Sequence, residues 1–335
     1  MKVRKVVLSG VLAATAALAL APPASAKTAT TACRRTTSTE LLAPTSIVMQ
    51  VTGAYRYKGH DYSAVGERLK FSGHLEGASL EGEPIKLTVF AGTHPVRSAT
   101  LNLIGQGCSI AEFTYNARLT TPGRITWKIE HVASASVDAF TQTAVGPTVY
   151  RRAYGFGSRG IGVSILLAML RGKGYYAPRG RTYGPGTGKA VLAFRKVNRM
   201  ARIESPSRQI YHLLQAGRGG IRARYPRMGE HLEADLSRQV LTFYKGSKAL
   251  EIHPISSGKP STPTILGKYQ FYMREPGTNG HGMVYSVYFH NGYATHGYAE
   301  LPTYPASHGC LRTWVPSARH IYHRIKLGEW IAVFW

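Results

Sequence analysis

Two short segments near the end of the chain hold the residue types that a cysteine nucleophile requires. The first contains His296, and Cys310 follows fourteen positions later, directly after a histidine–glycine pair. A free thiol is only a few per cent ionised at neutral pH, so a cysteine nucleophile needs a nearby base or positive charge. His296, His308, His320 and His323 are candidates for that base. In an extended segment His308 and Cys310 would point to the same face, so spacing alone leaves the choice of base open.

The pattern of the two segments is specific. They read THG at residues 295–297 and SHGCLR at residues 307–312, which resembles the catalytic signature of the L,D-transpeptidases, cysteine enzymes that cross-link bacterial peptidoglycan. The likeness continues through ADLSRQVL at 234–241 and SGKPSTPT at 257–264, although residues 265–267 read ILG where the family usually has PTG. The resemblance implies a β-rich, YkuD-type catalytic domain over residues 231–335, with neither a metal nor a cofactor.

The resemblance also implies which residues carry the proton. Cys310 is the expected nucleophile, and His296 is expected to take the thiol proton and later return it. His308 matches the histidine of the family's HGC turn. Two roles for His308 stay open, namely direct proton transfer and a structural hydrogen bond.

The turn beside the nucleophile supplies further expected contacts. Gly309 permits a sharp turn, and the N–H groups of Gly309 and Cys310 are expected to stabilise the oxyanion of the reaction. Arg312 is expected either to bind a stem-peptide carboxylate or to hold the turn through a salt bridge. Ser307 is expected to form hydrogen bonds within the loop, and Gly297 is grouped with the substrate-binding residues.

A cysteine–histidine–carboxylate triad would need an acidic residue behind the base. None of the acidic residues of the C-terminal region is placed for this by a motif: Glu233, Asp235, Glu251, Glu275, Glu300 and Glu329. A backbone carbonyl is therefore expected to orient His296, as the resemblance also implies.

The implied reaction begins on a donor stem peptide. Cys310 attacks the carbonyl at the L-centre of its diaminopimelate residue, terminal D-Ala leaves, and the amine of a second stem resolves the thioester into a 3-3 cross-link. Resolution by water would give an L,D-carboxypeptidase.

The same residues are also compatible with a catalytically inactive cell-wall-binding protein. A zinc site is a further possibility, and its candidate ligands are His281, His290, His296, His308 and Cys310. Their spacings fit no compact ligand pair on one helix, which disfavours zinc.

The first 26 residues have the pattern of an export signal. Lys2, Arg4 and Lys5 precede an uncharged run over residues 6–21, and Ala-Ser-Ala at 24–26 forms a small-residue cleavage site. No later apolar run is long enough to span a bilayer. We therefore expect a secreted, wall-associated protein without a stable membrane anchor, acting in peptidoglycan synthesis, cell wall organisation and cell shape.

The charge of the chain is strongly basic and uneven. Lys and Arg number 42 against 17 Asp and Glu, and between Arg151 and Glu230 seventeen basic residues face two acidic ones. An exported basic protein meets anionic wall polymers rather than nucleic acid. The expected partners are thus peptidoglycan stem peptides and anionic wall polymers, although the excess charge could simply aid solubility.

Three cysteines in an exported chain leave one unpaired after any pairing. Cys33 and Cys108 would form a disulfide in an oxidising compartment if the fold brings them together, which the sequence leaves open. Cys310 would then remain free, as a nucleophile must.

Hydrophobic periodicity divides the mature chain into three parts, mainly β. Residues 46–150 alternate with period two between turn clusters, which predicts an immunoglobulin-like β-sandwich. Residues 155–220 carry three short helical stripes, the third expected to be capped by Ser205 and Pro206, and resemble a small peptidoglycan-binding module. Residues 231–335 return to strands, with one helix opening at Val315. The segment 275–282 before the site strands is either a lid or an ordinary hairpin.

Overall fold

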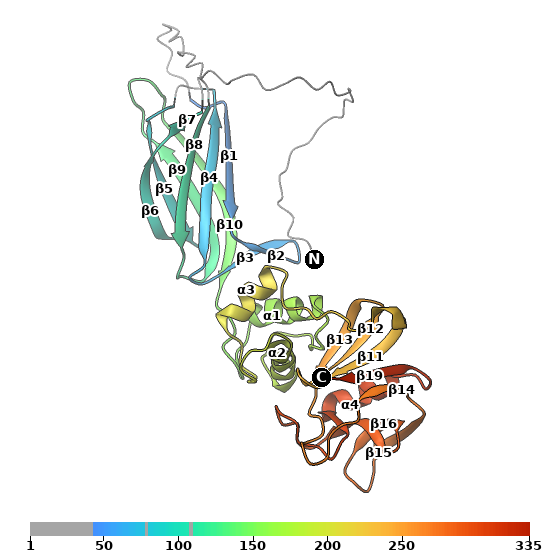
Figure 1. The fold of residues 1–335 in the computed structure, drawn as a ribbon. Helices are drawn as coiled ribbons and strands as arrows, with labels where there is room; N and C mark the ends of the chain where they lie inside the picture. Colours follow the sequence, from blue (N-terminus) through green and yellow to red (C-terminus); the bar gives the residue numbers. More distant parts are fainter. Residues whose placement is uncertain (1–42, 78–79, 107–109) are drawn as a thin grey trace, which may run out of the picture. The chain divides into compact units, whose positions relative to one another are not determined.

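The computed structural model describes residues 43–77, 80–106 and 110–335, which form two compact units that divide between Arg151 and Arg152 (Figure 1). Strands predominate, so the mainly β fold expected from the sequence is confirmed. The export signal, Cys33 and Cys108 lie outside the described residues. The ranges 46–150, 155–220 and 231–335 stay predictions as domain boundaries.

The first unit is built from two sheets. In spatial order, the smaller sheet consists of β1 (Ser46–Thr52), β4 (Arg68–Glu76), β8 (Ile110–Arg118) and β7 (Ile104–Gly105). The larger sheet consists of β2 (Tyr55–Tyr57), β3 (His60–Ala64), β10 (Phe140–Tyr150), β9 (Gly123–His131), β5 (Pro84–Ala91) and β6 (His94–Asn102).

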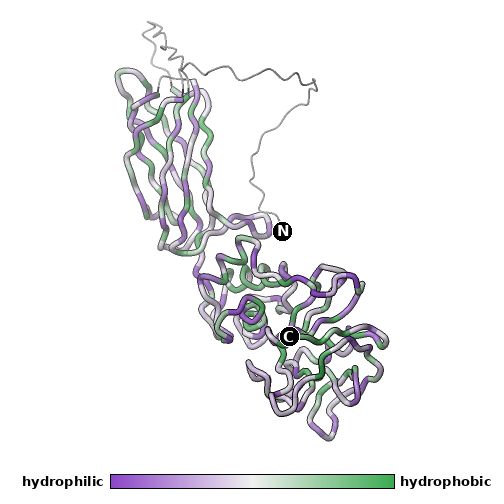
Figure 2. The backbone as a smooth tube through the Cα atoms, viewed as in Figure 1, coloured by the Kyte–Doolittle hydropathy of each residue, from purple (hydrophilic) through white to green (hydrophobic). Residues whose placement is uncertain are grey.

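The core of this unit lies between the two sheets. Buried and exposed residues alternate along β4 and β9, as period-two strands with one covered face require, and hydrophobic and hydrophilic stretches alternate along these strands in Figure 2. Phe71 of β4 meets Trp127 of β9 edge to face, with ring centroids 5.2 Å apart, and both side chains are fully buried. The unit is therefore a sandwich, with aromatic contacts joining its sheets.

Truncation of Phe71 should weaken this unit. We expect Phe71→Ala to lower the free energy of unfolding by about 3–5 kcal/mol, because it opens a cavity beside Trp127. Val48→Ala, on the same sheet but 56% exposed, should stay within about 0.5 kcal/mol of the parent. Urea unfolding followed by circular dichroism measures both, and equal losses in the two variants would contradict the assigned core.

The second unit begins with three helices: α1 (Ile161–Gly172), α2 (Pro185–Val197) and α3 (Arg208–Gln215). Their apolar stripes are buried, as their helical spacing predicts. The predicted cap of the third helix is wrong by two residues, because the hydroxyl of Ser207, not Ser205, accepts the N–H of Ile210. None of the helices in the described ranges is long and apolar enough to cross a bilayer.

Two further sheets follow the short helix η1 (Pro226–Met228). In spatial order, the first consists of β13 (Lys248–Pro254), β12 (Val240–Lys245), β11 (Glu230–Asp235), β19 (Trp330–Phe334) and β14 (Gly267–Gln270). The second consists of β15 (Met273–Thr278), β16 (Val284–His290), β17 (Tyr293–Tyr298) and β18 (Leu311–Trp314). Helix α4 (Val315–Arg324) starts where β18 ends, as expected for Val315.

A single hydrophobic core joins these two sheets and α4. It includes Leu232 and Ile331 from the first sheet, Val287 and Leu311 from the second, and Ile321 from α4. Helix α4 packs on β16 and β17, whereas α2 packs on β13 and β12. The helical segment and the strands that follow it therefore belong to one unit.

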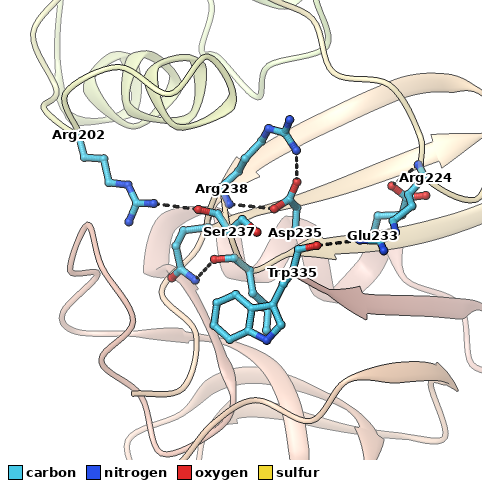
Figure 3. A network of polar contacts seen from close by, with 9 residues as sticks. Arg202, Arg224, Glu233, Asp235, Ser237, Arg238 and Trp335 are labelled. Carbon is cyan, nitrogen blue, oxygen red and sulfur yellow. Dashed lines mark hydrogen bonds and ion pairs between the residues drawn. The ribbon is translucent and has the colours of Figure 1, made fainter. Parts of the chain in front are cut away.

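Basic side chains connect the helical segment to the strands by donating to backbone carbonyls. Arg202 donates to the carbonyls of Thr303 and Ser237, at 3.0 Å each, and Arg224 donates to the carbonyl of Trp335 at 2.7 Å (Figure 3). Such charge-assisted bonds are stronger than bonds between neutral groups. Some of the basic residues in 151–230 thus stabilise the fold through these hydrogen bonds.

The acidic residues of this region are also used in the fold. Glu233 accepts the backbone N–H groups of Arg224 and Tyr225, at 2.9 and 2.7 Å. Asp235 accepts the N–H of Arg238 at 2.8 Å and pairs with its guanidinium (Figure 3). These two carboxylates therefore anchor the start of the strand region.

The segment 275–282 forms a hairpin between β15 and β16, and a role as a lid stays a prediction. Residues of β15 pair with β16, and the side chain of Asn279 accepts the N–H groups of His281 and Met283. Glu275 accepts hydrogen bonds from Asn279 and from the hydroxyl of Tyr288. The ordinary hairpin considered for this segment is therefore the arrangement observed.

Candidate active site

The parallel pairing of β17 with β18 brings the segments of the candidate nucleophile and base side by side. His296 pairs with Arg312, and Thr295 pairs with Leu311. Side chains of paired residues in a sheet share a face, and residues two apart on one strand do so as well. Cys310 directly precedes β18, so strand pairing brings its stretch of backbone next to the strand of His296. That these two residues exchange a proton stays a prediction.

His296 is held by a backbone carbonyl. The side chain is 3% exposed, and its Nδ1 lies 2.9 Å from the carbonyl oxygen of Gly297. Because that oxygen only accepts, Nδ1 carries the proton and Nε2 is the basic nitrogen. The prediction that a carbonyl orients this ring is confirmed. Burial lowers the pKa of His296, and the charge of Arg312 lowers it further, so the ring is neutral at neutral pH.

The thiol of Cys310 is partly enclosed by backbone groups. Its sulfur lies 3.6 Å from the carbonyl oxygen of Gly292, and the N–H of Ala294 hydrogen-bonds the sulfur. Burial raises the pKa of Cys310, while the Ala294 N–H and the positive charge of Arg312 lower it in part. The resting pair is therefore a neutral thiol and a neutral imidazole, which suits proton transfer during attack.

Arg312 lies over an aromatic ring at the site. Its guanidinium carbon is 4.0 Å from the centroid of Tyr298, and its backbone pairs with Ser256 on the opposite side of β18. No acidic side chain forms an ion pair with it in the described part of the chain, so the predicted salt bridge is not observed there. A stacked guanidinium keeps its donors available for an anionic ligand.

The turn before Cys310 is closed by its own hydrogen bonds. Ser307 is buried, donates to the carbonyl of Cys310 at 2.6 Å, and accepts the N–H of Gly309 at 3.0 Å. The predicted loop contacts of Ser307 are thus confirmed. The Gly309 N–H is occupied in this way, so its expected role as an oxyanion donor needs correction, and the Cys310 N–H is the remaining candidate.

Gly309 is required at its position for two reasons. Its φ is +120°, a backbone conformation that side chains with a Cβ rarely adopt. A Cβ there would also stand 2.7 Å from the ring of Tyr293. The aromatic ring thus packs directly on the backbone of the turn that carries the nucleophile.

Thr264 is a positioning residue to which the sequence analysis gave no role. Its buried hydroxyl donates to the carbonyl of Gly309 at 2.7 Å and accepts the N–H of Gly258 at 2.8 Å. Gly258 in turn pairs with Ser307 in an isolated bridge. The SGKPSTPT segment therefore braces the turn before Cys310 from the side opposite β17. In the sequence, the only sign of this role was that the segment resembles the corresponding segment of the family.

His308 lies apart from this arrangement. Its side chain is exposed, and its Nε2 is 3.4 Å from the Nζ of Lys259. The extended geometry that would align it with Cys310 is absent, because β18 begins only at Leu311 and Gly309 turns the chain. Both of its predicted roles stay predictions.

Gly297 serves packing. A Cβ at this position would lie 2.7 Å from that of Ala318 in α4, and its carbonyl holds His296. Its expected place among the substrate-binding residues stays a prediction, and the structure adds a packing role, because period-two alternation turns this position toward α4.

The remaining histidines of the proposed zinc set are spread over separate elements. His281 lies in the turn between β15 and β16, and His290 ends β16. Over residues 43–77, 80–106 and 110–335, no three His, Cys, Asp or Glu side chains are grouped so as to hold a metal ion.

Comparison with known proteins identifies the fold and class of this region. Residues 229–333 match the family model of the YkuD L,D-transpeptidase catalytic domain. The chain therefore carries a catalytic domain of this family, and its strand region has the corresponding fold.

Several solved structures are similar. An L,D-transpeptidase (residues 123–326) from Xylanimonas cellulosilytica is 28% identical with a TM-score of 0.51, over 55% of this chain and 98% of that one. A C442S mutant of the Enterococcus faecium L,D-transpeptidase is 27% identical with a TM-score of 0.28, over 32% of this chain and 50% of that one. An L,D-transpeptidase from Mycobacterium smegmatis is 13% identical with a TM-score of 0.29, and the match covers 86% of this chain and 100% of that one. No curated protein matches the chain.

The electrostatics of the site predict how the alkylation of Cys310 depends on pH. We expect its alkylation by iodoacetamide to have a midpoint above that of a free cysteine, because burial raises the pKa of the thiol. Arg312→Gln should move the midpoint to still higher pH, since it removes a charge that favours the thiolate. Peptide-resolved mass spectrometry separates Cys310 from the other cysteines. The exposed Arg319→Gln is the matched control, and an equal shift there would contradict the assigned role of Arg312.

The bracing role of Thr264 predicts a loss of stability. Thr264→Val retains the shape but removes both hydrogen bonds of the hydroxyl, leaving a buried carbonyl and a buried N–H unpaired. We expect the free energy of unfolding to fall by about 1–3 kcal/mol. The exposed Thr278→Val should change little, and urea titration of both variants makes the comparison. A Thr264→Val protein as stable as the parent would exclude this role.

Proposed function

We propose that the protein is an L,D-transpeptidase that forms 3-3 cross-links between peptidoglycan stem peptides through a thioester on Cys310. The observation that carries the proposal is the pairing of β17 with β18, which brings the segment that ends in Cys310 next to the strand of a buried His296 whose Nδ1 is fixed by a carbonyl. An imidazole with a free Nε2 and a lowered pKa is a suitable base for a thiol.

In the proposed first half-reaction, His296 Nε2 takes the thiol proton as the sulfur attacks the carbonyl at the L-centre of diaminopimelate. The Cys310 N–H and Arg312 stabilise the developing negative charge. The tetrahedral intermediate collapses when the C–N bond to D-Ala breaks, and the imidazolium returns its proton to the leaving amine. The products are free D-Ala and a thioester on Cys310.

In the second half-reaction an amine of the acceptor stem replaces D-Ala. His296 takes a proton from this amine as it attacks the thioester, the C–S bond breaks, and the thiol is restored. Attack by water on the same thioester would make the protein an L,D-carboxypeptidase. The ratio of cross-linked to hydrolysed product distinguishes these outcomes.

The proposal includes a location outside the cytoplasm. It rests on the signal pattern of residues 1–26 and on the peptidoglycan substrate. The basic excess supports contact with anionic wall polymers in the same compartment. A wall-binding protein without activity is the competing possibility, and the catalytic test below decides between the two.

The test incubates the protein with a disaccharide tetrapeptide and identifies the products by mass. We expect D-Ala release and a cross-linked dimer from the parent, and neither from Cys310→Ala. His296→Gln should slow turnover by about 10²–10⁴-fold, the usual contribution of a general base, whereas the exposed His281→Gln should match the parent. Hydrolysed tripeptide without dimer would indicate the carboxypeptidase. Product from Cys310→Ala, or none from the parent, would refute the proposed function.

A further inference from the structure

A cavity of about 530 Å³ lies inside the 152–335 unit, away from Cys310. The segment between α1 and α2, together with the start of α2, forms one wall. The end of β13 and the junction between β18 and α4 form the other. This volume is within the range of small-molecule sites, about 300–1,000 Å³. The transpeptidase reaction described above makes no use of this cavity.

The electrostatics of the cavity favour an anion. Arg179, Arg181 and Lys189 line it, and no acidic residue does so among the described residues. Lys189 is paired with Glu204, whereas Arg179 and Arg181 are exposed and form no ion pair in the part of the chain that the structure describes. Two guanidinium groups are thus available to a phosphate or a carboxylate.

The N-terminus of α2 lies in the same wall. The helix starts with Gly184 as N-cap and Pro185 in its first turn, which contains no acidic side chain, and no side chain caps it. Its thirteen residues direct the positive end of their summed peptide dipoles toward the cavity lining. This contribution adds to the charge of the two arginines.

Thr187 supplies independent support for a ligand. It lines the cavity, its side chain is 1% exposed, and its Oγ1 has no hydrogen-bond partner among the described residues. A buried hydroxyl without a partner destabilises the fold, so its presence calls for a group that it could bond. A ligand oxygen held between Thr187 and the arginines would satisfy it.

Aromatic side chains provide a second kind of surface. Trp314 and Tyr176 both line the cavity. A Cβ at Gly186 would be 3.4 Å from Cη2 of Trp314, so the indole lies close against the start of α2. Tyr176 is fixed by ring contacts with His253 and His320, at 4.7 and 4.8 Å between centroids. Flat, fixed rings of this kind suit the apolar face of a sugar.

We propose that this cavity binds an anionic saccharide, a sugar ring that carries a phosphate or a carboxylate. The anion lies between Arg179, Arg181 and Thr187, and the ring lies against Trp314. Because Trp314 ends the strand that begins after Cys310, a wall polymer bound here would be held beside the catalytic strand. The site is separate from the thioester chemistry, so its test does not depend on the proposed function.

The test is isothermal titration calorimetry at low salt with four probes: glucose 1-phosphate, glucuronic acid, glucose and inorganic phosphate. We expect one or both charged sugars to bind the parent protein and the Cys310→Ala variant equally well. The double variant R179A/R181A should bind at least about tenfold more weakly, and Thr187→Val should bind severalfold more weakly. R218A/R222A removes two exposed arginines of the same helical segment outside the cavity, and should bind like the parent.

Each outcome decides the proposal. The stronger of the two charged sugars identifies the phosphate or the carboxylate as the preferred group. No heat with either charged sugar, or equal weakening in R179A/R181A and R218A/R222A, would overturn the site. Glucose binding as tightly as the charged sugars would overturn the anionic part, and inorganic phosphate binding as tightly would overturn the saccharide part. Circular dichroism of all variants ensures that folded proteins are compared.

Discussion

The parallel register of β17 and β18 is the constraint on which the candidate site depends. It pairs His296 with Arg312 and sets Cys310, the proposed nucleophile, one position before the strand. The opposite face turns Gly297 toward Ala318 of α4 and Leu311 into the core. A shift by one residue would exchange these faces and turn Leu311 away from the core. Core packing therefore favours the observed register.

Several side chains of this unit are held in place by hydrogen bonds to backbone carbonyls. A carbonyl fixes the tautomer of His296, Thr264 holds the carbonyl of Gly309, and Lys196 of α2 donates to the carbonyl of Ile255 at 2.7 Å. Burial lowers the pKa of Lys196 to about 7, helped by the charges of Arg202 and Lys189. Ile255 directly precedes Ser256, which pairs with Arg312. The helical segment thus contacts, through Lys196, the residue next to the one that pairs with β18.

The sequence was sufficient to predict the helices and strands and the family of the catalytic domain. It was insufficient to predict contacts between segments that are distant in the chain. Period-two and helical spacing predicted the sandwich, the three helices and α4, because burial of one face imposes a regular pattern. The resemblance to the L,D-transpeptidase signature selected Cys310 and His296 as candidates. The bracing by Thr264 joins residues 45 positions apart, and no local pattern encodes such a bond. The same limit explains why the contact of the Gly309 N–H with Ser307 and the cap of α3 were missed, since each depends on the position of a partner.

Burial of the reacting pair explains why a neutral resting state suits this site. Placing a thiolate and an imidazolium in a partly enclosed site would require removal of water from two charges, and that cost is recovered only with close pairing and additional hydrogen bonds. The sulfur has the Ala294 N–H and the charge of Arg312 to stabilise it, but burial still raises the pKa of Cys310 above its ordinary value. Proton transfer that accompanies attack avoids a stable buried ion pair. In the proposed reaction negative charge develops on the substrate oxygen, and Arg312 is available to stabilise it because it has no acidic partner among the described residues.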